Sequence, residues 1–382
     1  MKANPGGQVA PNEVVGRDTL IASLWDILER QSAILSAERR MGKTSIIKKM
    51  EAEPPENKLP IFRDLEHVGS PLEFVEAVLQ DVEEYLSKKQ KVANRTRQLL
   101  QDLRGLEVKG FKLPQEIASD WKKILKAVID DLVTNQERQV ILLWDEVPYM
   151  LDKIGNVAAI EVLDTLRSLR QTYPDVRMVF TGSIGLHHVV NELKQKGYAN
   201  EPTNDMYPVD VPPLSEEDAT ALASELLEGE KIPTANLQEV AAAIARSVSC
   251  IPFYIHHLIA RLKMRNDTVE PTTVLEVVGD CLLDPLNPWK MEHYRDRITN
   301  YYDSDRQAYA LNLLDILSNA ERALSFDDLF ASLRLEPQTQ DREIAKDVLR
   351  LLGKDYYIVR QKDLKYSFRY PLIQRYWQFL RG

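Results

Sequence analysis

The 382-residue sequence is poor in cysteine and glycine, and it contains no long apolar run. Its two cysteines, Cys250 and Cys281, lie in unrelated contexts without metal-ligand spacing, which excludes a disulfide scaffold and indicates a reducing compartment. No apolar stretch approaches the roughly 18 residues that cross a bilayer, and residues 1–7 lack the apolar segment of a signal peptide. We therefore expect a cytoplasmic protein without membrane contact, with residues 1–7 as a frayed tail.

A large excess of positive charge is also missing. The chain carries 49 basic and 58 acidic side chains, a formal net charge of −9, which excludes a protein that coats nucleic acid through bulk charge. The acidity is concentrated in residues 201–290, which hold 15 acidic and 6 basic side chains. Residues 354–382 are instead rich in lysine and arginine, so a local contact with nucleic acid stays open.

Short apolar runs alternate with helical patterns over residues 14–211. The patterns between the runs include helical spacing over 71–88 and a polar stretch, 90–112, that we predict to be an irregular insert. Alternation of this kind predicts a three-layer α/β domain, which we assign to residues 1–213. The runs with the character of buried parallel strands are 32–36, 59–64, 140–146, 177–183 and 207–211.

Two further domains are predicted after Pro213. Residues 214–288 contain several helical patterns and no convincing strand, which predicts a small, acidic, all-α lid. Residues 289–382 contain three helical patterns, the last over 342–352, followed by β-like runs at 356–361 and 364–369. Three helices followed by a hairpin are typical of a winged-helix domain.

The strongest chemical signal is Gly42-Lys43-Thr44, which follows a predicted strand and precedes a predicted helix. In a phosphate-binding loop, backbone N–H groups surround the phosphates, a lysine reaches the β and γ oxygens, and a hydroxyl helps to hold Mg²⁺. The N-terminus of the helix adds its dipole. We therefore predict that ATP or ADP binds here with Mg²⁺, through the loop and first helical turn, namely Ala37, Glu38, Arg39, Arg40, Met41, Gly42, Lys43, Thr44 and Ser45.

Ala37 stands where this motif has its first glycine, and its Cβ restricts positive φ. The sequence leaves open whether the loop is altered or whether Ala37 occupies an ordinary region. It also leaves open whether Arg39 and Arg40 contact phosphate, a neighbouring subunit or solvent.

The second half of the predicted site is Asp145-Glu146, at the end of an apolar strand. An aspartate there can hold Mg²⁺, and the following carboxylate can activate the attacking water. Thr181-Gly-Ser183 follows the next strand, and we predict Ser183 as a hydroxyl that senses the γ-phosphate. An ordinary turn would explain the same residues.

These segments together resemble the STAND class of AAA+-related ATPases. The resemblance rests on residues 14–17, 36–45, 142–146 and 180–183, and it points to the archaeal-type branch, which is similar to origin-recognition initiators. It implies a P-loop NTPase fold of the ASCE, AAA+-like type, with Val15, Gly16 and Arg17 near the adenine.

The same resemblance bears on the later domains. The family lid carries Gly-x-Pro beside the nucleotide; here Pro252 matches the proline and Cys250 replaces the glycine. Many relatives continue into a nuclease-like domain, and this sequence ends at Gly382, so we expect no nuclease activity.

The winged-helix region offers a candidate surface for double-stranded DNA. Basic residues at i, i+4 and i+8 of its third helix share one face, and others surround the hairpin. Packing or regulation would explain this region equally well. The candidate DNA-binding residues are Arg342, Lys346, Arg350, Arg360, Lys362, Lys365 and Arg369.

The histidines suggest no metal site. We expect adjacent pairs such as His187 and His188 to point to different faces of a helix and to serve structural roles.

The sequence thus predicts an ATP-binding and slowly hydrolysing molecular switch. Mg-ATP would bind between the α/β core and the lid, and its state would set the orientation of lid and winged helix, and with it homo-oligomerisation or partner binding. Two alternatives stay open: an ATP-gated initiator or loader that binds DNA, and a non-hydrolysing scaffold for a separately encoded effector.

Overall fold

We describe a computed structural model of the chain, which covers residues 1–87, 115–182, 185–265 and 267–381. These residues form two compact units. The sheet unit comprises Ala10–Ser36 and Lys43–Val211, and the helical unit comprises Met1–Val9, Ala37–Gly42 and Pro212–Gly382. The six residues of the predicted phosphate loop therefore pack with the helical unit, although both flanking segments belong to the sheet unit.

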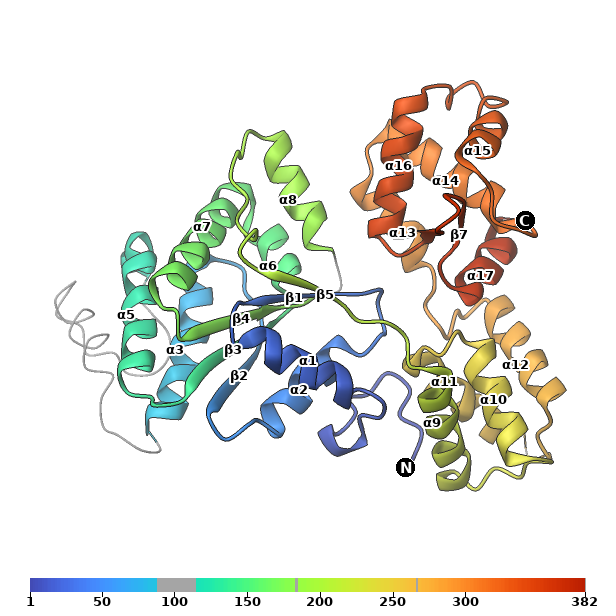
Figure 1. Ribbon diagram of the computed structural model, residues 1–382, viewed down its shortest axis with the longest axis horizontal. Coiled ribbons are helices and arrows are strands. Elements are labelled where there is room, and N and C mark those ends of the chain that lie inside the picture. Colours follow the sequence, from blue (N-terminus) through green and yellow to red (C-terminus); the bar gives the residue numbers. More distant parts are fainter. Residues whose placement is uncertain (88–114, 183–184, 266, 382) are drawn as a thin grey trace. The chain divides into compact units, whose positions relative to one another are not determined.

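A five-stranded parallel sheet forms the centre of the sheet unit (Figure 1). The strand order is β2-β3-β4-β1-β5, so β4 lies between β1 and β3. All pairings within it are parallel. The strands are β1 (Ala33–Ser36), β2 (Lys58–Asp64), β3 (Gln139–Asp145), β4 (Val176–Phe180) and β5 (Tyr207–Asp210).

Helices cover both faces of this sheet. They include α1 and α2 on one face, and α3, α5 and α7 on the other (Figure 1). This arrangement confirms the predicted three-layer α/β architecture. The helical elements are η1 (Pro11–Glu13), α1 (Asp18–Leu28), α2 (Lys43–Ala52), α3 (Pro71–Ser87), η2 (Gln115–Asp120), α5 (Trp121–Thr134), α6 (Val147–Ile154), α7 (Asn156–Thr172) and α8 (Leu186–Gln195). The predicted insert at 90–112 lies outside the described residues.

The central strand β3 is apolar on both faces because helices cover both. Residues 140–144 are each at most 2% exposed. Successive side chains of a strand point to opposite faces, so Leu142 and Trp144 join one core and Leu143 the other. Trp144 stacks on Phe180 of β4 at 6.0 Å and meets the edge of Phe74 of α3 at 5.1 Å. This packing fixes the carboxyl end of β3, where Asp145 follows.

The first part of the helical unit is a bundle of α9 (Glu216–Gly229), α10 (Leu237–Ser247), α11 (Pro252–Lys263) and α12 (Pro271–Leu283). Side chains cap its helix starts. Ser215 accepts a hydrogen bond from the Asp218 amide, and Asn236 accepts from the amides of Gln238 and Glu239. The bundle occupies the region that the sequence assigned to an all-α lid.

The C-terminal region contains α13 (His293–Tyr301), α14 (Ser304–Ser318), α15 (Phe326–Leu333), α16 (Arg342–Lys354), β6 (Ile358–Arg360), β7 (Tyr366–Phe368) and α17 (Pro371–Arg381). Strands β6 and β7 pair antiparallel. The three helices that the sequence predicted correspond to α14, α15 and α16, and α13 precedes them. Helix α17 is fixed on α14 because Trp377 Nε1 and the Arg381 guanidinium both donate to Asp315.

The N-terminal residues differ from the sequence expectation. We expected residues 1–7 to be a frayed tail, but Met1–Val9 belongs to the helical unit. The Ala3 amide donates to Glu230 Oε1 at 2.9 Å, and the Asn4 amide donates to His256 Nδ1 at 3.2 Å. These bonds satisfy backbone groups that a free tail would give to water. No helix in the described part of the chain is long and apolar enough to cross a membrane.

Cys250 has an unusual backbone in the turn between α10 and α11. Both Ser249 and Cys250 have φ of 56°, the left-handed region that favours glycine. The turn is held by the Cys250 amide donating to Ala245, the Leu214 amide donating to the Cys250 carbonyl, and the Leu372 amide donating to Ser249 Oγ. Cys250 therefore places a Cβ where the backbone strains it, at the position where the Gly-x-Pro motif has glycine.

We predict that Cys250→Gly raises the free energy of unfolding by about 1 kcal/mol relative to Cys250→Ala, because only glycine relieves the left-handed strain. Urea denaturation of the two variants measures the difference. As a matched control, the same comparison at Ala243, inside α10, should favour alanine by about 1 kcal/mol. Equal stability of the Gly and Ala variants at 250 would contradict the assignment.

Candidate nucleotide-binding site

Lys43 and Thr44 form the first turn of α2, directly after the loop that follows β1. Lys43 is only 8% exposed. The first N–H groups of a helix have no partner within the helix and point to its N-terminal end, where the helix dipole also favours an anion. The start of α2 thus combines a buried lysine with the N-terminal end of a helix, which suits phosphate.

The loop itself adopts left-handed conformations at Arg40, with φ of 72°, and at Gly42, with φ of 87°. A side chain at position 42 would be strained whatever space surrounds it. Ala37 is not in the left-handed region. Replacing the motif's first glycine by alanine therefore imposes no backbone strain, which answers the question that the sequence left open.

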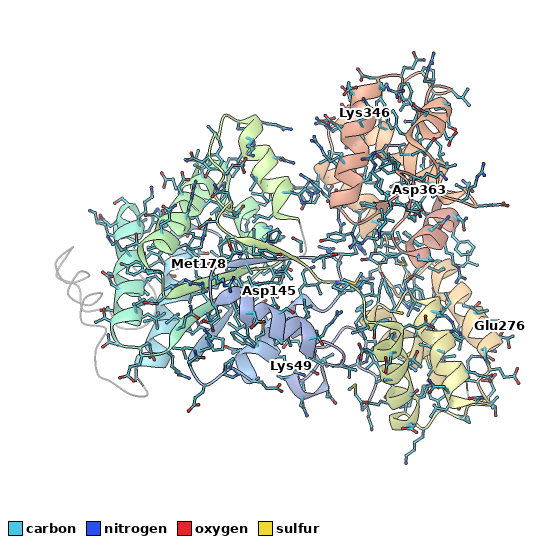
Figure 2. The ribbon with its side chains drawn as sticks, viewed as in Figure 1. Lys49, Asp145, Met178, Glu276, Lys346 and Asp363 are labelled. Carbon is cyan, nitrogen blue, oxygen red and sulfur yellow. The ribbon has the colours of Figure 1, made fainter. Side chains whose placement is uncertain are left out.

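Thr44 connects α2 to the end of β3. Its Oγ1 donates to Asp145 Oδ2 at 2.5 Å, and the Glu146 amide donates to Asp145 Oδ1 at 3.0 Å. Asp145, drawn in Figure 2, is 4% exposed. Burial raises the pKa of Asp145 above its ordinary value, although the hydrogen bonds from Thr44 and Glu146 oppose that shift. A hydroxyl and a carboxylate are hard oxygen donors of the kind that Mg²⁺ takes beside phosphate, so this pair fits the metal.

Asp64 is a further acid that the sequence analysis did not single out. It ends β2 and lies opposite Asp145 in the β2–β3 register. Its negative charge contributes to the raised pKa of Asp145. The available signal was its position as the last residue of a predicted strand. Two neighbouring carboxylates at one sheet edge favour a cation between or beside them.

Glu146 has a strained backbone. Its φ is 56°, and it is the residue that precedes α6, whose Met150 amide donates to its carbonyl. Such strain in a residue other than glycine costs about 1–3 kcal/mol and is common at functional sites. The Glu146 side chain is half-buried, beside the Thr44–Asp145 pair along the chain.

Thr181 follows β4 and brings a hydroxyl to the same edge of the sheet. The Thr181 amide donates to the Trp144 carbonyl, and the Val147 amide donates to the Thr181 carbonyl. Thr181 is 2% exposed, and among the described residues its Oγ1 has no hydrogen-bond partner. Ser183, the hydroxyl that the sequence predicted, lies outside the described residues. Residue 182, which follows Thr181, has no room for a side chain, because a Cβ on Gly182 would lie 2.6 Å from Cδ of Pro148.

The remaining predicted contacts fall into two groups. In the sheet unit, Val15, Gly16 and Arg17 directly precede α1. The chain on either side of them is held by Lys49 of α2, whose Nζ donates to the Val14 carbonyl and pairs with Asp18 at 2.9 Å. Gly16 has a φ of 65°. In the helical unit, Pro252 begins α11. Ser45 lies in the first turn of α2, and Met41 is fully buried.

The charged loop side chains bind the helical unit. Glu38 pairs with Arg297 of α13, and Arg40 donates to the Tyr254 hydroxyl at 3.0 Å and to the Trp289 carbonyl. The Arg39 amide donates to Glu38 Oε1. The side chains of Glu38 and Arg40 are thus engaged within the protein, and neither solvent nor a second subunit is needed to satisfy them.

The basic residues of the C-terminal region also have partners. Arg342 pairs with Asp327, Lys346 with Glu343, and Arg350 with Asp347 (Lys346 is drawn in Figure 2). On the hairpin, Lys365 pairs with Asp363, while Arg360 and Arg369 lie over tyrosine rings. Acidic neighbours reduce the positive potential that this surface offers to a phosphate backbone. Lys362 lies after β6 in the same hairpin and is exposed.

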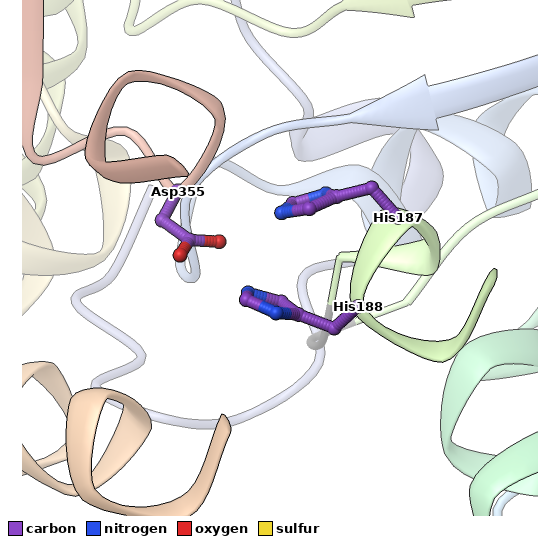
Figure 3. Close-up of side chains that lie close together, drawn as sticks. All are labelled: His187, His188 and Asp355. Atoms are coloured by element: carbon purple, nitrogen blue, oxygen red, sulfur yellow. The ribbon is translucent and has the colours of Figure 1, made fainter. Parts of the chain in front are cut away.

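His187 and His188 differ from the sequence expectation. We expected their side chains to point to different faces, but their rings are 4.3 Å apart between centroids at the start of α8 (Figure 3). Both residues lie in the first turn of α8.

The comparisons with known proteins support the fold. The Walker-type ATPase PABY2304 of Pyrococcus abyssi matches with a TM-score of 0.65 and 15% sequence identity, over 99% of this chain and 100% of that chain. The ORC2 protein of Aeropyrum pernix (TM-score 0.46, 12% identity, 98% and 96%) and the STAND protein PH0952 of Pyrococcus horikoshii (0.41, 14%, 99% and 44%) are weaker likenesses, on which we base nothing. A scan of protein-family models gives no match, and neither does a sequence search of curated proteins.

The fold is therefore that of a P-loop ATPase, as the sequence motifs predicted. At 15% identity, the likeness to PABY2304 establishes the fold and leaves activity to the residues of the site.

We predict that Thr44→Ala lowers the affinity for ATP in the presence of Mg²⁺ by about tenfold, because the variant lacks one of the two oxygens that we predict to hold the metal. In excess EDTA the affinity should change little. Thr44→Ser keeps the hydroxyl and serves as the control, with affinity close to wild type. Calorimetry with and without Mg²⁺ measures all three proteins; an equal loss in both conditions would exclude Thr44 as a metal ligand.

Proposed function

We propose that the chain binds Mg-ATP at the start of α2 and hydrolyses it slowly, as a molecular switch that alters partner binding or self-assembly of its helical unit. The observation that carries this proposal is the 2.5 Å hydrogen bond from Thr44 to Asp145. It joins the helix that offers phosphate donors to the strand end that offers a metal-binding carboxylate. Either half alone occurs in many proteins, and their pairing is what a Mg-nucleotide site requires.

Each residue has a distinct part in this proposal. Lys43 neutralises the β- and γ-phosphates, and Thr44 and Asp145 hold the metal. Mg²⁺, when bound, neutralises charge that develops on the phosphates. Glu146 orients and deprotonates the attacking water, and its strained backbone keeps the carboxylate at a fixed place. Thr181, whose buried hydroxyl has no hydrogen-bond partner in the described part of the chain, takes the γ-phosphate-facing role that the sequence gave to Ser183.

Other predicted nucleotide contacts stay part of the proposal. Val15, Gly16 and Arg17 would lie near the adenine, and Pro252 would carry the nucleotide state into the lid. The loop backbone from Ala37 to Gly42 would contact phosphate, while the side chains of Glu38 and Arg40 serve internal contacts. A homo-oligomer, double-stranded DNA and a separate effector protein remain the candidate partners.

DNA binding by the winged-helix region is the weaker candidate. On α16, each of Arg342, Lys346 and Arg350 has an acidic partner within hydrogen-bonding distance. DNA would have to displace those partners before the face could bind phosphate. The structure therefore favours a packing or regulatory role for this helix.

We predict that Lys43→Ala abolishes measurable ATP binding, because Lys43 is the cation that would neutralise the phosphate charge at the start of α2. Calorimetry with Mg-ATP measures this loss. The control is Lys123→Ala, which removes a lysine of α5 that is 69% exposed and should leave affinity unchanged. Wild-type affinity in Lys43→Ala would disprove the site.

We predict that Glu146→Gln binds Mg-ATP normally and releases phosphate at least about 100-fold more slowly, because the amide cannot accept the proton of water. Glu161→Gln, on the partly exposed surface of α7, is the matched control and should turn over at the wild-type rate. Single-turnover phosphate release measures both. Absence of turnover in the wild-type protein as well would favour the non-hydrolysing scaffold.

A further inference from the structure

Glu38 is a buried acid on the loop that precedes the nucleotide-binding helix. Its side chain has no exposed surface, and Arg297 of α13 binds its carboxylate through two guanidinium nitrogens. Nη2 donates to Oε1 at 2.7 Å, and Nη1 donates to Oε2 at 3.0 Å. Bidentate ion pairs of this kind fix the orientation of both side chains in addition to pairing their charges.

Both partners are ionised. Burial alone would raise the pKa of Glu38, but the charge of Arg297 and the neighbouring His293 outweigh it and hold that pKa well below its usual range. Burial alone would lower the pKa of Arg297, but the charge and hydrogen bonds of Glu38, together with Tyr357 and Asp355, outweigh it and raise that pKa above its usual value. The pair therefore carries both charges at neutral pH, and loss of either member would leave a buried charge uncompensated.

The Glu38 carboxylate also holds the loop backbone. Its Oε1 accepts a hydrogen bond from the Arg39 amide at 2.7 Å. The carboxylate consequently follows any rotation of the loop at residues 38–39. Because Arg297 is bonded to both carboxylate oxygens, it follows as well.

Arg297 extends this connection to the end of α16. Its Nη1 also donates to the Asp355 carbonyl at 2.9 Å, and its guanidinium lies 5.7 Å from the centre of the Tyr357 ring. The Asp355 carboxylate, drawn in Figure 3, accepts from the Tyr302 hydroxyl at 2.6 Å. One side chain thus joins the loop, α13 and the turn between α16 and β6.

A second loop residue is fixed to a different part of the same unit. The Arg40 guanidinium lies 4.2 Å from the centre of the Phe253 ring and donates to the Tyr254 hydroxyl and the carbonyls of Trp289 and Lys290. Arg40 also has the left-handed backbone noted above. The loop is therefore attached to α11 through Arg40 and to α13 through Glu38.

We propose that Glu38 is a positioning residue, and that its pair with Arg297 transmits the state of the phosphate loop to α13 and the α16–β6 turn. This inference rests on the proposed function, because it requires nucleotide to bind the loop. Binding of phosphate by the loop amides changes their backbone geometry. The Arg39 amide is hydrogen-bonded directly to the Glu38 carboxylate of the pair. The nucleotide signal reaches the C-terminal region through this pair without passing through the turn at Pro252.

Hydrogen–deuterium exchange with and without Mg-ATP tests the transmission in four full-length proteins. In the wild type, Mg-ATP should change amide protection in 293–301 and 355–358 by about fivefold or more, a typical allosteric coupling. Glu38→Gln/Arg297→Gln replaces the ion pair by a neutral one and should still bind Mg-ATP but show no such change. Arg295→Gln, an exposed residue of the same helix, should behave like the wild type.

Arg297→Lys is the fourth protein and guards against failure of the double variant to fold. It keeps the positive charge and loses the second hydrogen bond to the Glu38 carboxylate. The Mg-ATP-dependent change in amide protection should therefore be reduced, and the fold should be retained. A full wild-type change in a nucleotide-bound double variant or in Arg297→Lys would overturn the inference. Calorimetry on the same samples separates the two claims: wild type that binds no Mg-ATP refutes the proposed function, whereas binding without a protection change refutes only the transmission.

Discussion

The loop between Ser36 and Lys43 is the constraint on which the rest of the structure depends. Its ends continue into β1 and α2 of the sheet unit, while its middle is fixed to the helical unit through Glu38 and Arg40. A buried ion pair contributes little net stability, because desolvation of both charges offsets their attraction. Here the pair holds the loop instead, because the Glu38 carboxylate accepts from two nitrogens of Arg297 and from the Arg39 amide.

The sheet supplies the chemistry to which that loop is connected. Strand β4 lies between β1 and β3, so the residues after these three strands share one edge. That edge carries Asp145, Glu146 and Thr181, and the Thr44–Asp145 hydrogen bond connects α2 to it. The buried apolar character of β3 makes the edge rigid, which suits a site that must place metal and water within fractions of an ångström.

Much of this could be predicted from the sequence, because apolar runs and the Gly42-Lys43-Thr44 motif are local signals. The strands of the parallel sheet lie close to their predicted runs, and the helix predicted over 342–352 is α16, Arg342–Lys354. Helix α13, His293–Tyr301, was not predicted. The Glu38–Arg297 pair could not be predicted, since its members are 259 positions apart and each looks like an ordinary charged residue. The same holds for Thr181, whose unpaired hydroxyl depends on tertiary burial, and for residues 1–7, whose docking depends on Glu230 and His256.

The central claim is that one loop serves both the nucleotide and the helical unit, and Trp289 can report on it directly. Its carbonyl accepts from Arg40, and its ring is fully buried. In protein labelled with 5-fluorotryptophan, and with Trp289→Phe to assign the signal, Mg-ATP should shift the ¹⁹F resonance of Trp289 while that of Trp121, on α5 of the sheet unit, stays in place. A Trp289 resonance that does not move at saturating Mg-ATP would contradict the account.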